Sequence, residues 1–407
     1  MALVKIEPLL QAKLNHLHQQ GVRKGDEKII TGVLPPSAGC GLRYRLQGYN
    51  DRAFLRMNSN SYLGLARHPA VIEAEMRAVE EFGAGPGAVR FISGTYAPHV
   101  ELERRLATFH GREAAMLFSA AYATMTGVLP QLISDQTLVV SDTLNHNCII
   151  NAIRLAHPAG KAIYAHGDIS ELENILNTNR DRYQRVCVVT DGVFSMRGDH
   201  APLAELAACC ATRQNDYAEG IVTIVDDSHG VGAFGRTGRG TEEVSGAQAD
   251  VLIGTLGKAF GVNGGYVAAS ATTIAYLRET APLYIYSNPI TPAEAAAALA
   301  ALDVLESAEG LRLLERLRDF SRKLRSGLQR LGFETLTGEH PIVPLFIRDT
   351  AKTAALVAYL FDRDILATGL NYPVVPQGDQ EIRLQISAEH TVEDLDYLLN
   401  VLKDFHC

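Results

Sequence analysis

Residues 221–229, IVTIVDDSH, join a short apolar segment to a group of polar side chains, and this pattern decides the fold. Other apolar segments of the same length recur along the chain, and amphipathic stretches such as 170–177 and 202–213 separate most of them. Uniformly apolar strands that alternate with helices predict an α/β fold with a mainly parallel sheet covered on both faces. The seven expected strands are 114–118, 137–141, 161–165, 185–191, 221–227, 250–255 and 264–270.

Beyond residue 291 the pattern changes to long helices rich in alanine and leucine, at 292–306 and 309–332. Apolar segments at 342–348 and 381–387 then flank a helix at about 352–363, which is typical of a small α+β domain. A chain of 407 residues is long enough for a large domain and a smaller one. We expect an N-terminal segment (1–57) that packs with the small domain, a large ligand-binding domain (58–291) and a small α+β domain (292–407).

The composition is that of a globular protein, with 47% hydrophobic and 21% charged residues. The net charge is −8 and the basic residues are scattered, which argues against nucleic acid or an anionic membrane as partner. Residues 1–21 have a helical leucine pattern rather than that of a secretion signal, and no stretch reaches the ~20 apolar residues of a membrane span. The six cysteines are scattered, so we expect free thiols, no metal site and a cytoplasmic location.

Two glycine-rich motifs resemble nucleotide sites but lack the required context. Residues 230–235, GVGAFG, match the dinucleotide fingerprint, yet a charged loop follows them instead of the helix that must meet the pyrophosphate. Residues 254–260, GTLGKAF, resemble a phosphate-binding loop, but Leu252 and Ala259 occupy two of its obligatory positions. We therefore expect neither motif to bind a nucleotide.

Two of the expected strands lead to polar residues that together could bind an aldehyde cofactor. One leads to Asp226 and His229, and the other leads to Thr255 and Lys258. Ligands bind at the carboxyl ends of parallel strands, where these residues would meet. A partly buried lysine has a lowered pKa and forms an imine with an aldehyde, and an aspartate can keep a pyridine nitrogen protonated. Alone, Lys258 would be a solvated loop lysine and Asp226 a helix cap; together they favour a pyridoxal 5′-phosphate site.

Two further segments fit such a site. Residues 117–127, LFSAAYATMTG, place small residues and backbone N–H groups at the start of a helix, which suits a phosphate. His146 follows another expected strand, where an imidazole can stack on a flat ring. A lone histidine is more often a packed or capping residue, so this role for His146 depends on its neighbours.

A series of segments then shows a resemblance to a family. The chain resembles the α-oxoamine synthases, which are fold-type I enzymes dependent on pyridoxal phosphate, from about residue 5 to residue 400. Within that family, TDGVFSM, DDSH, TGRG, TLGKA, YSN and PVVPQG most resemble the glycine C-acetyltransferases (2-amino-3-ketobutyrate CoA ligases). The segments that carry the resemblance are NSNSYLGLARHP (58–69), FISGTYAPHVELE (91–103), LNHNCIINAIRL (144–155), TDGVFSMRGD (190–199), VDDSHGVGAFGRTGRG (225–240), GTLGKAFG (254–261), YSNPITPA (286–293) and IRLQIS (382–387).

The resemblance implies a role for each residue of the site. Catalytic roles fall to Lys258, His146, His229 and Asp226. Cofactor binding would also involve Ala121, Tyr122, Ser195 and Thr255, together with Ser287 and Asn288 from the neighbouring subunit of a homodimer; Asn60 and Arg383 would bind the substrate carboxylate.

The implied reaction joins an amino acid such as glycine to the acyl group of an acyl-CoA. It gives an α-amino ketone or a 2-amino-3-oxo acid and releases CoA. Ser61, Met125 and the loop at Pro86 depart from the family pattern, so another amino acid and a longer acyl chain stay open. An aminotransferase or a decarboxylase with the same cofactor is the alternative among enzymes. A binding protein on the same scaffold is disfavoured, because all the catalytic residues are present.

Overall fold

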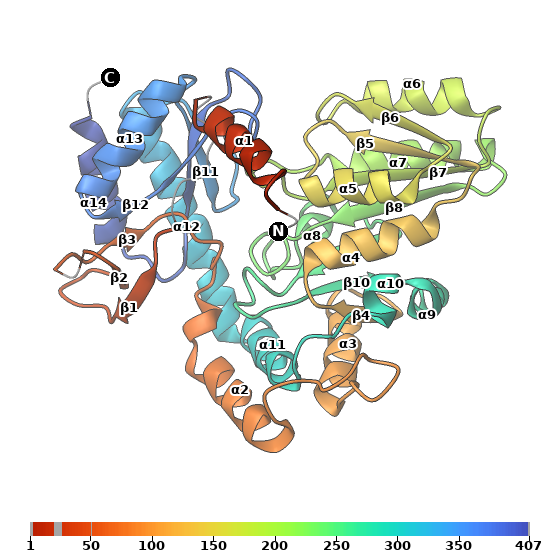
Figure 1. Cartoon of the computed structure of the whole chain (residues 1–407), viewed down its shortest axis with the longest axis horizontal. Coiled ribbons are helices and arrows are strands. Elements are labelled where there is room, and N and C mark those ends of the chain that lie inside the picture. Colours follow the sequence, from red (N-terminus) through yellow and green to blue (C-terminus); the bar gives the residue numbers. More distant parts are fainter. Residues whose placement is uncertain (1–2, 20–26, 50, 406–407) are drawn as a thin grey trace. The chain divides into compact units, whose positions relative to one another are not determined.

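The structure is a computed structural model, and it describes residues 3–19, 27–49 and 51–405. The described residues form two compact units (Figure 1). The larger unit contains Asn60–Ser321 and Gly338–Pro341, and the smaller contains the residues before Asn60, those of 322–337 and those from Ile342 onward. The ends of the N-terminal helical pattern, at 1–2 and 20–21, and Cys407 lie outside the described residues.

A seven-stranded sheet forms the centre of the larger unit. Its strands are β4 (Ala114–Phe118), β5 (Thr137–Asp142), β6 (Gly160–Tyr164), β7 (Arg185–Asp191), β8 (Ile221–Asp226), β9 (Val251–Thr255) and β10 (Gly265–Ala269). They lie in the order β4-β10-β9-β8-β7-β5-β6, and only β10 runs antiparallel to its neighbours. These are the seven strands that the sequence predicts, so the mainly parallel α/β fold is confirmed.

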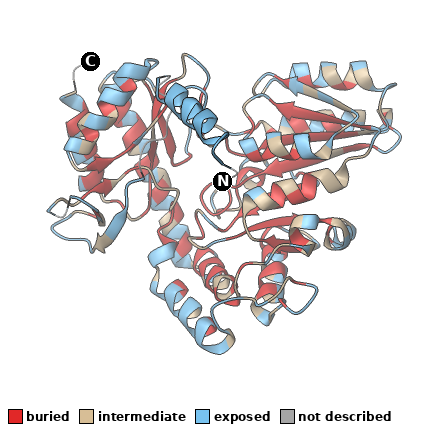
Figure 2. Cartoon of the chain, viewed as in Figure 1, coloured by how far each residue is buried: buried red, intermediate tan, exposed pale blue. Residues whose placement is uncertain are grey.

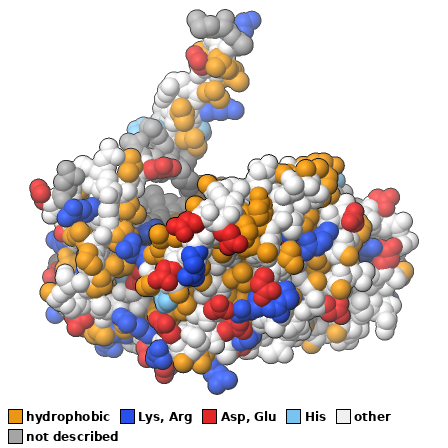
Figure 3. Space-filling model, turned by 90° about the horizontal axis from the view of Figure 1, so that it is seen from below, with side chains coloured by type: hydrophobic (Ala, Val, Ile, Leu, Met, Phe, Trp, Pro, Cys, Tyr) orange, Lys and Arg blue, Asp and Glu red, His pale blue; other side chains and the backbone are white. Residues whose placement is uncertain are grey.

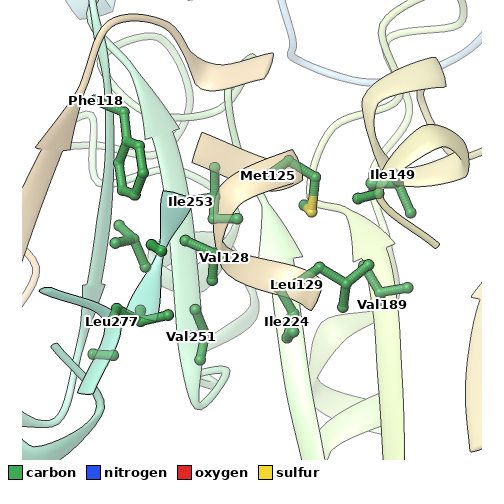
Figure 4. Packing of buried hydrophobic residues seen from close by; sticks show 14 of the residues in the cluster. Phe118, Met125, Val128, Leu129, Ile149, Val189, Ile224, Val251, Ile253 and Leu277 are labelled. Carbon is green, nitrogen blue, oxygen red and sulfur yellow. The ribbon is translucent and has the colours of Figure 1, made fainter. Parts of the chain in front are cut away.

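Helices cover both faces of this sheet. The helices that lie wholly in the larger unit are α2 (Pro69–Phe82), α3 (Ala97–Phe109), α4 (Ala121–Val128), α5 (Asn147–Ala156), α6 (Ile169–Asn179), α7 (Leu203–Arg213), α8 (Thr241–Ser245), α9 (Ala271–Thr280), α10 (Pro282–Ile285) and α11 (Pro292–Leu305). Side chains alternate across each strand, so Val139 and Val189 pack with α4, α5 and α9, whereas Val140 and Val188 pack with α6 and α7. Figure 4 shows the first of these two cores. Each buried valine or leucine contributes about 1.5–3 kcal/mol.

The helix at 292–305 groups with the larger unit, which differs from the expected boundary at residue 291. Helix α11 begins in a capping box, in which the Thr291 hydroxyl accepts the N–H of Glu294 and the Glu294 carboxylate accepts the N–H of Thr291. Its alanines are buried and let it pack closely against α2 and α3. Helix α12 (Ala308–Arg330) then continues from the larger unit into the smaller one.

The smaller unit is built on a three-stranded antiparallel sheet with the order β11-β14-β13. In the same unit, a separate two-stranded sheet joins N-terminal and C-terminal residues. There β3 pairs with β12 in parallel, and Leu55 lies opposite Ile365. The elements of the smaller unit are α1 (Glu7–Gln19), β1 (Ile30–Leu34), β2 (Arg43–Leu46), β3 (Leu55–Arg56), β11 (Ile342–Phe346), α13 (Thr350–Asp362), β12 (Ile365–Leu366), β13 (Thr368–Leu370), β14 (Glu381–Gln385) and α14 (Val392–Lys403).

Burial differs sharply among these elements. Figure 2 shows the inner strands of the large sheet, such as β5 and β7, as buried, whereas α1 has no buried residue. Across the described part of the chain, no helix is long and apolar enough to cross a membrane. On the face shown in Figure 3, acidic and basic side chains are interspersed rather than separated by sign.

Candidate active site

A pocket of about 260 Å³ lies in the larger unit and gathers most of the expected site residues. Three of its lining residues come from the ends of neighbouring strands: Asp191 ends β7, Asp226 ends β8 and Thr255 ends β9. The carboxyl ends of parallel strands are where α/β sheets bind ligands. The pocket is lined by Ala121, Tyr122, His146, Cys148, Asp191, Val193, Ser195, Asp226, Ser228, His229, Thr255 and Lys258.

Helix α4 begins at the pocket, and its first residues are Ala121 and Tyr122. No side chain caps this helix end, so its first N–H groups are available to an anion. The preceding peptide lies against Gly265 of β10, where an added Cβ would come within 2.3 Å of the Ala121 nitrogen. Glycine at 265 therefore lets the start of the helix approach the sheet.

Thr255 and Lys258 occupy a tight turn that follows β9. The Thr255 hydroxyl donates to the Gly264 carbonyl at 3.2 Å and accepts the Gly257 N–H at 3.1 Å. Gly261 has φ of +72°, and an added Cβ would lie 2.2 Å from the Ala66 nitrogen. Gly261 thus allows a close backbone approach three residues after Lys258, which is itself half-buried.

Asp226 is buried in the pocket wall and accepts two hydrogen bonds. The Ser228 N–H donates to Oδ1 at 3.1 Å, and the Cys148 thiol donates to Oδ2 at 3.3 Å. Next to it, Asp191 accepts the backbone N–H of His146 at 2.8 Å. Burial, together with the charge of Asp226, holds the pKa of Asp191 well above its ordinary value.

His146 both caps a helix and lines the pocket. Its Nδ1 accepts the backbone N–H of Cys148 at 3.2 Å, which caps the start of α5. Capping is the ordinary role of such a histidine, and His146 fills it at the pocket wall. The cap also fixes the neutral ring as the tautomer with hydrogen on Nε2.

His229 is 7% exposed and lies beside the buried Tyr62. The Tyr62 hydroxyl is 2.7 Å from Nδ1 of His229, and Nε2 of His340 is 2.9 Å from the His229 carbonyl oxygen. These contacts hold both the ring and the backbone of His229 in place at the pocket.

The lining residues fit pyridoxal phosphate. A helix start and the Thr255 turn suit a phosphate, and a lysine and a buried carboxylate suit its aldehyde and its ring nitrogen. The buried Ser228 hydroxyl lines the same pocket and has no hydrogen-bond partner among the residues that the structure describes. Such an orphaned group is typical of a site that binds a polar ligand. Among the described residues, no cluster of His, Cys, Asp or Glu is arranged to hold a metal ion.

Four expected site residues do not line this pocket. Ser287 is half-buried and Asn288 is exposed, just after α10. Asn60 is half-buried, and the Tyr62 hydroxyl lies 3.4 Å from its Oδ1. Arg383 belongs to the smaller unit, in the central strand β14 opposite Pro344.

Four lining residues were absent from the expected set. Asp191 ends an apolar strand just as Asp226 does, so the same sequence signal was available for it. Ser228 lies within the quoted DDSH segment and Val193 within TDGVFSM. Cys148 is a small residue inside a helix and carries no local signal of a site.

The GVGAFG segment forms part of a folded loop around a buried carboxylate. Asp227 is fully buried and accepts the Thr241 N–H and hydroxyl, each at 2.7 Å. An added Cβ at Gly230 or Gly240 would lie within 2.2 Å of the Asp227 carboxylate. Packing around the Asp227 carboxylate therefore requires glycine at both positions.

Comparison with known proteins identifies the family. The aminotransferase class I and II family matches residues 52–402. An 8-amino-7-oxononanoate synthase from Geobacter metallireducens is 42% identical over 343 residues, which cover 84% of this chain and 86% of that protein.

Solved structures agree with this match. A serine palmitoyltransferase from Sphingomonas wittichii has a TM-score of 0.87 at 28% identity, over 98% of this chain and 97% of that chain. A serine palmitoyltransferase from S. paucimobilis, solved with a bound adduct of PLP and myriocin, has a TM-score of 0.87 at 27% identity over the same shares.

These relatives carry names other than glycine C-acetyltransferase, so they support the family that the sequence indicates and not its narrower glycine–acetyl specificity. The family and its cofactor are nevertheless shown. The chain belongs to the α-oxoamine synthases, the pyridoxal-phosphate-dependent acyltransferases within aminotransferase class I and II.

Proposed function

We propose that this enzyme condenses alanine with a seven-carbon diacid carried as a thioester and releases carbon dioxide. The observation that supports this most strongly is the 42% identity to an 8-amino-7-oxononanoate synthase over most of both chains. That name describes a nine-carbon acid with a ketone at carbon 7 and an amine at carbon 8. Division between these two carbons gives a seven-carbon acyl group and the amine of decarboxylated alanine.

The proposed reaction balances without an oxidant. The carbon–sulfur bond of the thioester breaks as the new carbon–carbon bond forms, and the thiol leaves with one proton. The bond from Cα to the alanine carboxylate breaks, and the carboxylate leaves as carbon dioxide. An acyl-CoA is the expected donor, so each turnover releases one CoA.

When bound, pyridoxal phosphate supplies an aldehyde for imine formation and a ring that accepts the electron pair of Cα. Lys258 would provide the amine that holds the group, and its Nζ would move the proton at Cα. Asp226 would keep a proton on the ring nitrogen, and His229 would donate a hydrogen bond to the ring oxygen. His146, which lines the pocket, would pack on the face of the ring.

The remaining expected residues would bind the cofactor phosphate and orient the amino-acid substrate. The N–H groups of Ala121 and Tyr122 at the start of α4, with the hydroxyl of Thr255, would bind the phosphate, and Ser195 would lie near the cofactor. Asn60 and Arg383 bind the carboxylate of the amino acid, and the forked guanidinium suits this task because it makes two parallel hydrogen bonds.

Mass spectrometry of the products from a matrix of amino acids and acyl-CoAs tests the proposal. We expect alanine with the seven-carbon diacid thioester to give 8-amino-7-oxononanoate together with an equal amount of free CoA. Alanine labelled with carbon-13 in its carboxylate should release the label as carbon dioxide. A preference for glycine with acetyl-CoA, or retention of the label, would contradict the proposed substrates and leave the family assignment intact. Conversion of the amino acid without CoA release would instead indicate an aminotransferase or a decarboxylase.

We further propose a cytoplasmic homodimer in which Ser287 and Asn288 reach the phosphate of the partner's site. Both follow α10, and Tyr286 beside them is 79% exposed. The cytoplasmic location is supported by the five described cysteines, all of which are free thiols. Mixing inactive Lys258→Ala subunits with inactive Asn288→Ala subunits should restore part of the activity, because mixed dimers hold one complete site. Monomers in light scattering would contradict the dimer.

A further inference from the structure

The thiol of Cys148 lies between the two residues proposed to act on the cofactor ring. Cys148 is 2% exposed and lines the pocket from the first turn of α5. Its Sγ donates to Oδ2 of Asp226 at 3.3 Å and lies 3.0 Å from Nδ1 of His146. A thiol has one hydrogen to share between these acceptors, and the carboxylate is the stronger of the two.

Asp191 forms the second half of the same cluster. It lies opposite Asp226 in the parallel register of β7 and β8, so two buried carboxylates end neighbouring strands. Its Oδ2 accepts the backbone N–H of His146. The Cys148 thiol contacts the ring of the same histidine. His146 is thus held through its backbone by one carboxylate and through its ring by Cys148.

We propose that Cys148 and Asp191 are positioning residues of the cofactor site, which hold Asp226 and His146 in one shared hydrogen-bond network. The inference rests on the roles proposed above for Asp226 and His146. It adds two residues that contact Asp226 and His146. The Cys148 thiol would orient Asp226 toward the ring nitrogen, and Asp191 would anchor His146 at the ring face.

The chemistry of the thiol supports a positioning role over a nucleophilic one. Burial, with the charges of Asp226 and Asp191, raises the pKa of Cys148 far above its ordinary value. The sulfur therefore keeps its hydrogen at physiological pH. A permanent S–H can donate to Asp226 throughout the working range, whereas a thiolate beside two carboxylates would repel them.

Cofactor affinity and the pH midpoint of the holoenzyme's visible absorbance test the network without relying on turnover. Cys148→Ala removes the donor, and we expect the dissociation constant of pyridoxal phosphate to rise about three- to tenfold, the range for one hydrogen bond. The absorbance midpoint should shift in the same variant, because Asp226 is less firmly oriented. Cys187→Ala is the matched control, since Cys187 is equally buried in the same core and does not line the pocket.

Asp191 is tested by a pair of substitutions. Asp191→Ala frees the His146 N–H and should weaken cofactor binding about tenfold, whereas Asp191→Asn keeps an oxygen acceptor and should restore affinity to within about threefold. In the double variant of Cys148→Ala and Asp191→Ala, the combined loss should be smaller than the product of the single losses, because both residues act on His146.

The outcomes separate this inference from the proposed function. If Cys148→Ala and Asp191→Ala bind the cofactor like wild type, while His146→Ala and Asp226→Ala bind it weakly, only the network is wrong. If His146→Ala and Asp226→Ala also bind normally, the proposed residue roles fail as well. Equal effects of Cys148→Ala and Cys187→Ala would reduce Cys148 to a packing residue and overturn the inference. Should Asp191→Ala not fold, Cys148→Ala and its control decide alone.

Discussion

The hydroxyl of Tyr62 lies 2.7 Å from Nδ1 of His229, and both side chains are buried. If the phenol donates this bond, neutral His229 carries its hydrogen on Nε2 and can donate a second bond from there. The rings also meet edge to face, at 6.2 Å between centroids. Tyr62 therefore contacts the ring of a pocket residue without lining the pocket itself.

Tyr62→Phe should weaken cofactor binding, because the ring stays packed while His229 loses the hydrogen bond that orients it. A net loss of about 1 kcal/mol corresponds to a roughly fivefold rise in the dissociation constant of pyridoxal phosphate. Tyr266→Phe is the control, since Tyr266 makes a similar buried bond of 2.8 Å to His110 and does not line the pocket. Equal cofactor affinity in the two variants would remove Tyr62 from the site.

Lys258→Ala should abolish the visible absorbance that pyridoxal phosphate gives in the wild-type enzyme. We also expect acyl transfer to fall by about 10²-fold or more, the range for loss of a positioned acid or base. Absorbance spectra after dialysis and a thiol assay for released CoA measure the two effects. Lys161→Ala, at an exposed position in β6, should change neither. A Lys258→Ala enzyme that keeps both properties would refute the assignment.

His166 should stabilise the fold in a pH-dependent way. Burial lowers the pKa of His166, but hydrogen bonds and charges from Asp142 and Asp199 outweigh it and raise the pKa to about 9. The folded-state pKa exceeds the unfolded value, so the contribution is full below about pH 6.5 and is lost as pH rises through 9. Arg197, which also pairs with Asp199, limits the effect.

Urea unfolding of wild type and His166→Gln measures this contribution as a difference in the free energy of unfolding. We expect wild type to be more stable by about 2 kcal/mol or less near pH 6, because the partly exposed ion pairs are screened by water. The difference should shrink as pH rises from about 6.5 to 9 and be absent above that range. A difference that is constant with pH would mean that His166 acts by packing alone.

Gly240→Ala should destabilise the protein far more than Gly246→Ala. Both glycines have positive φ, +85° and +68°, so each substitution costs about 1–2 kcal/mol in backbone strain. At Gly240 the added Cβ would also meet Oδ2 of the buried Asp227 at 1.9 Å, whereas nothing lies within 4 Å at Gly246. Thermal unfolding compares the two variants, and equal melting temperatures would show that the loop around Asp227 tolerates the extra methyl group.

Much of the site could be predicted from the sequence, because a change from apolar to polar residues marks the end of each strand. An apolar segment followed by Asp226, or by Thr255 and Lys258, is a local pattern, and parallel strands bring such ends to one edge. Asp191 has the same pattern, but nothing in the sequence says that β7 lies next to β8. The position of Cys148 is further from prediction, because its hydrogen bond to Asp226 joins residues 78 positions apart.

By itself, the sequence determined the seven strands, the helices between them and the family, since periodicity and motif order depend on neighbours along the chain. Only the tertiary structure decided that the strand order places Asp191 opposite Asp226, and that Tyr62 and Cys148 contact site residues far from them in the sequence. It also grouped α11 with the larger unit, against the boundary expected at residue 291. These features depend on register and side-chain packing between distant segments, which no local pattern encodes.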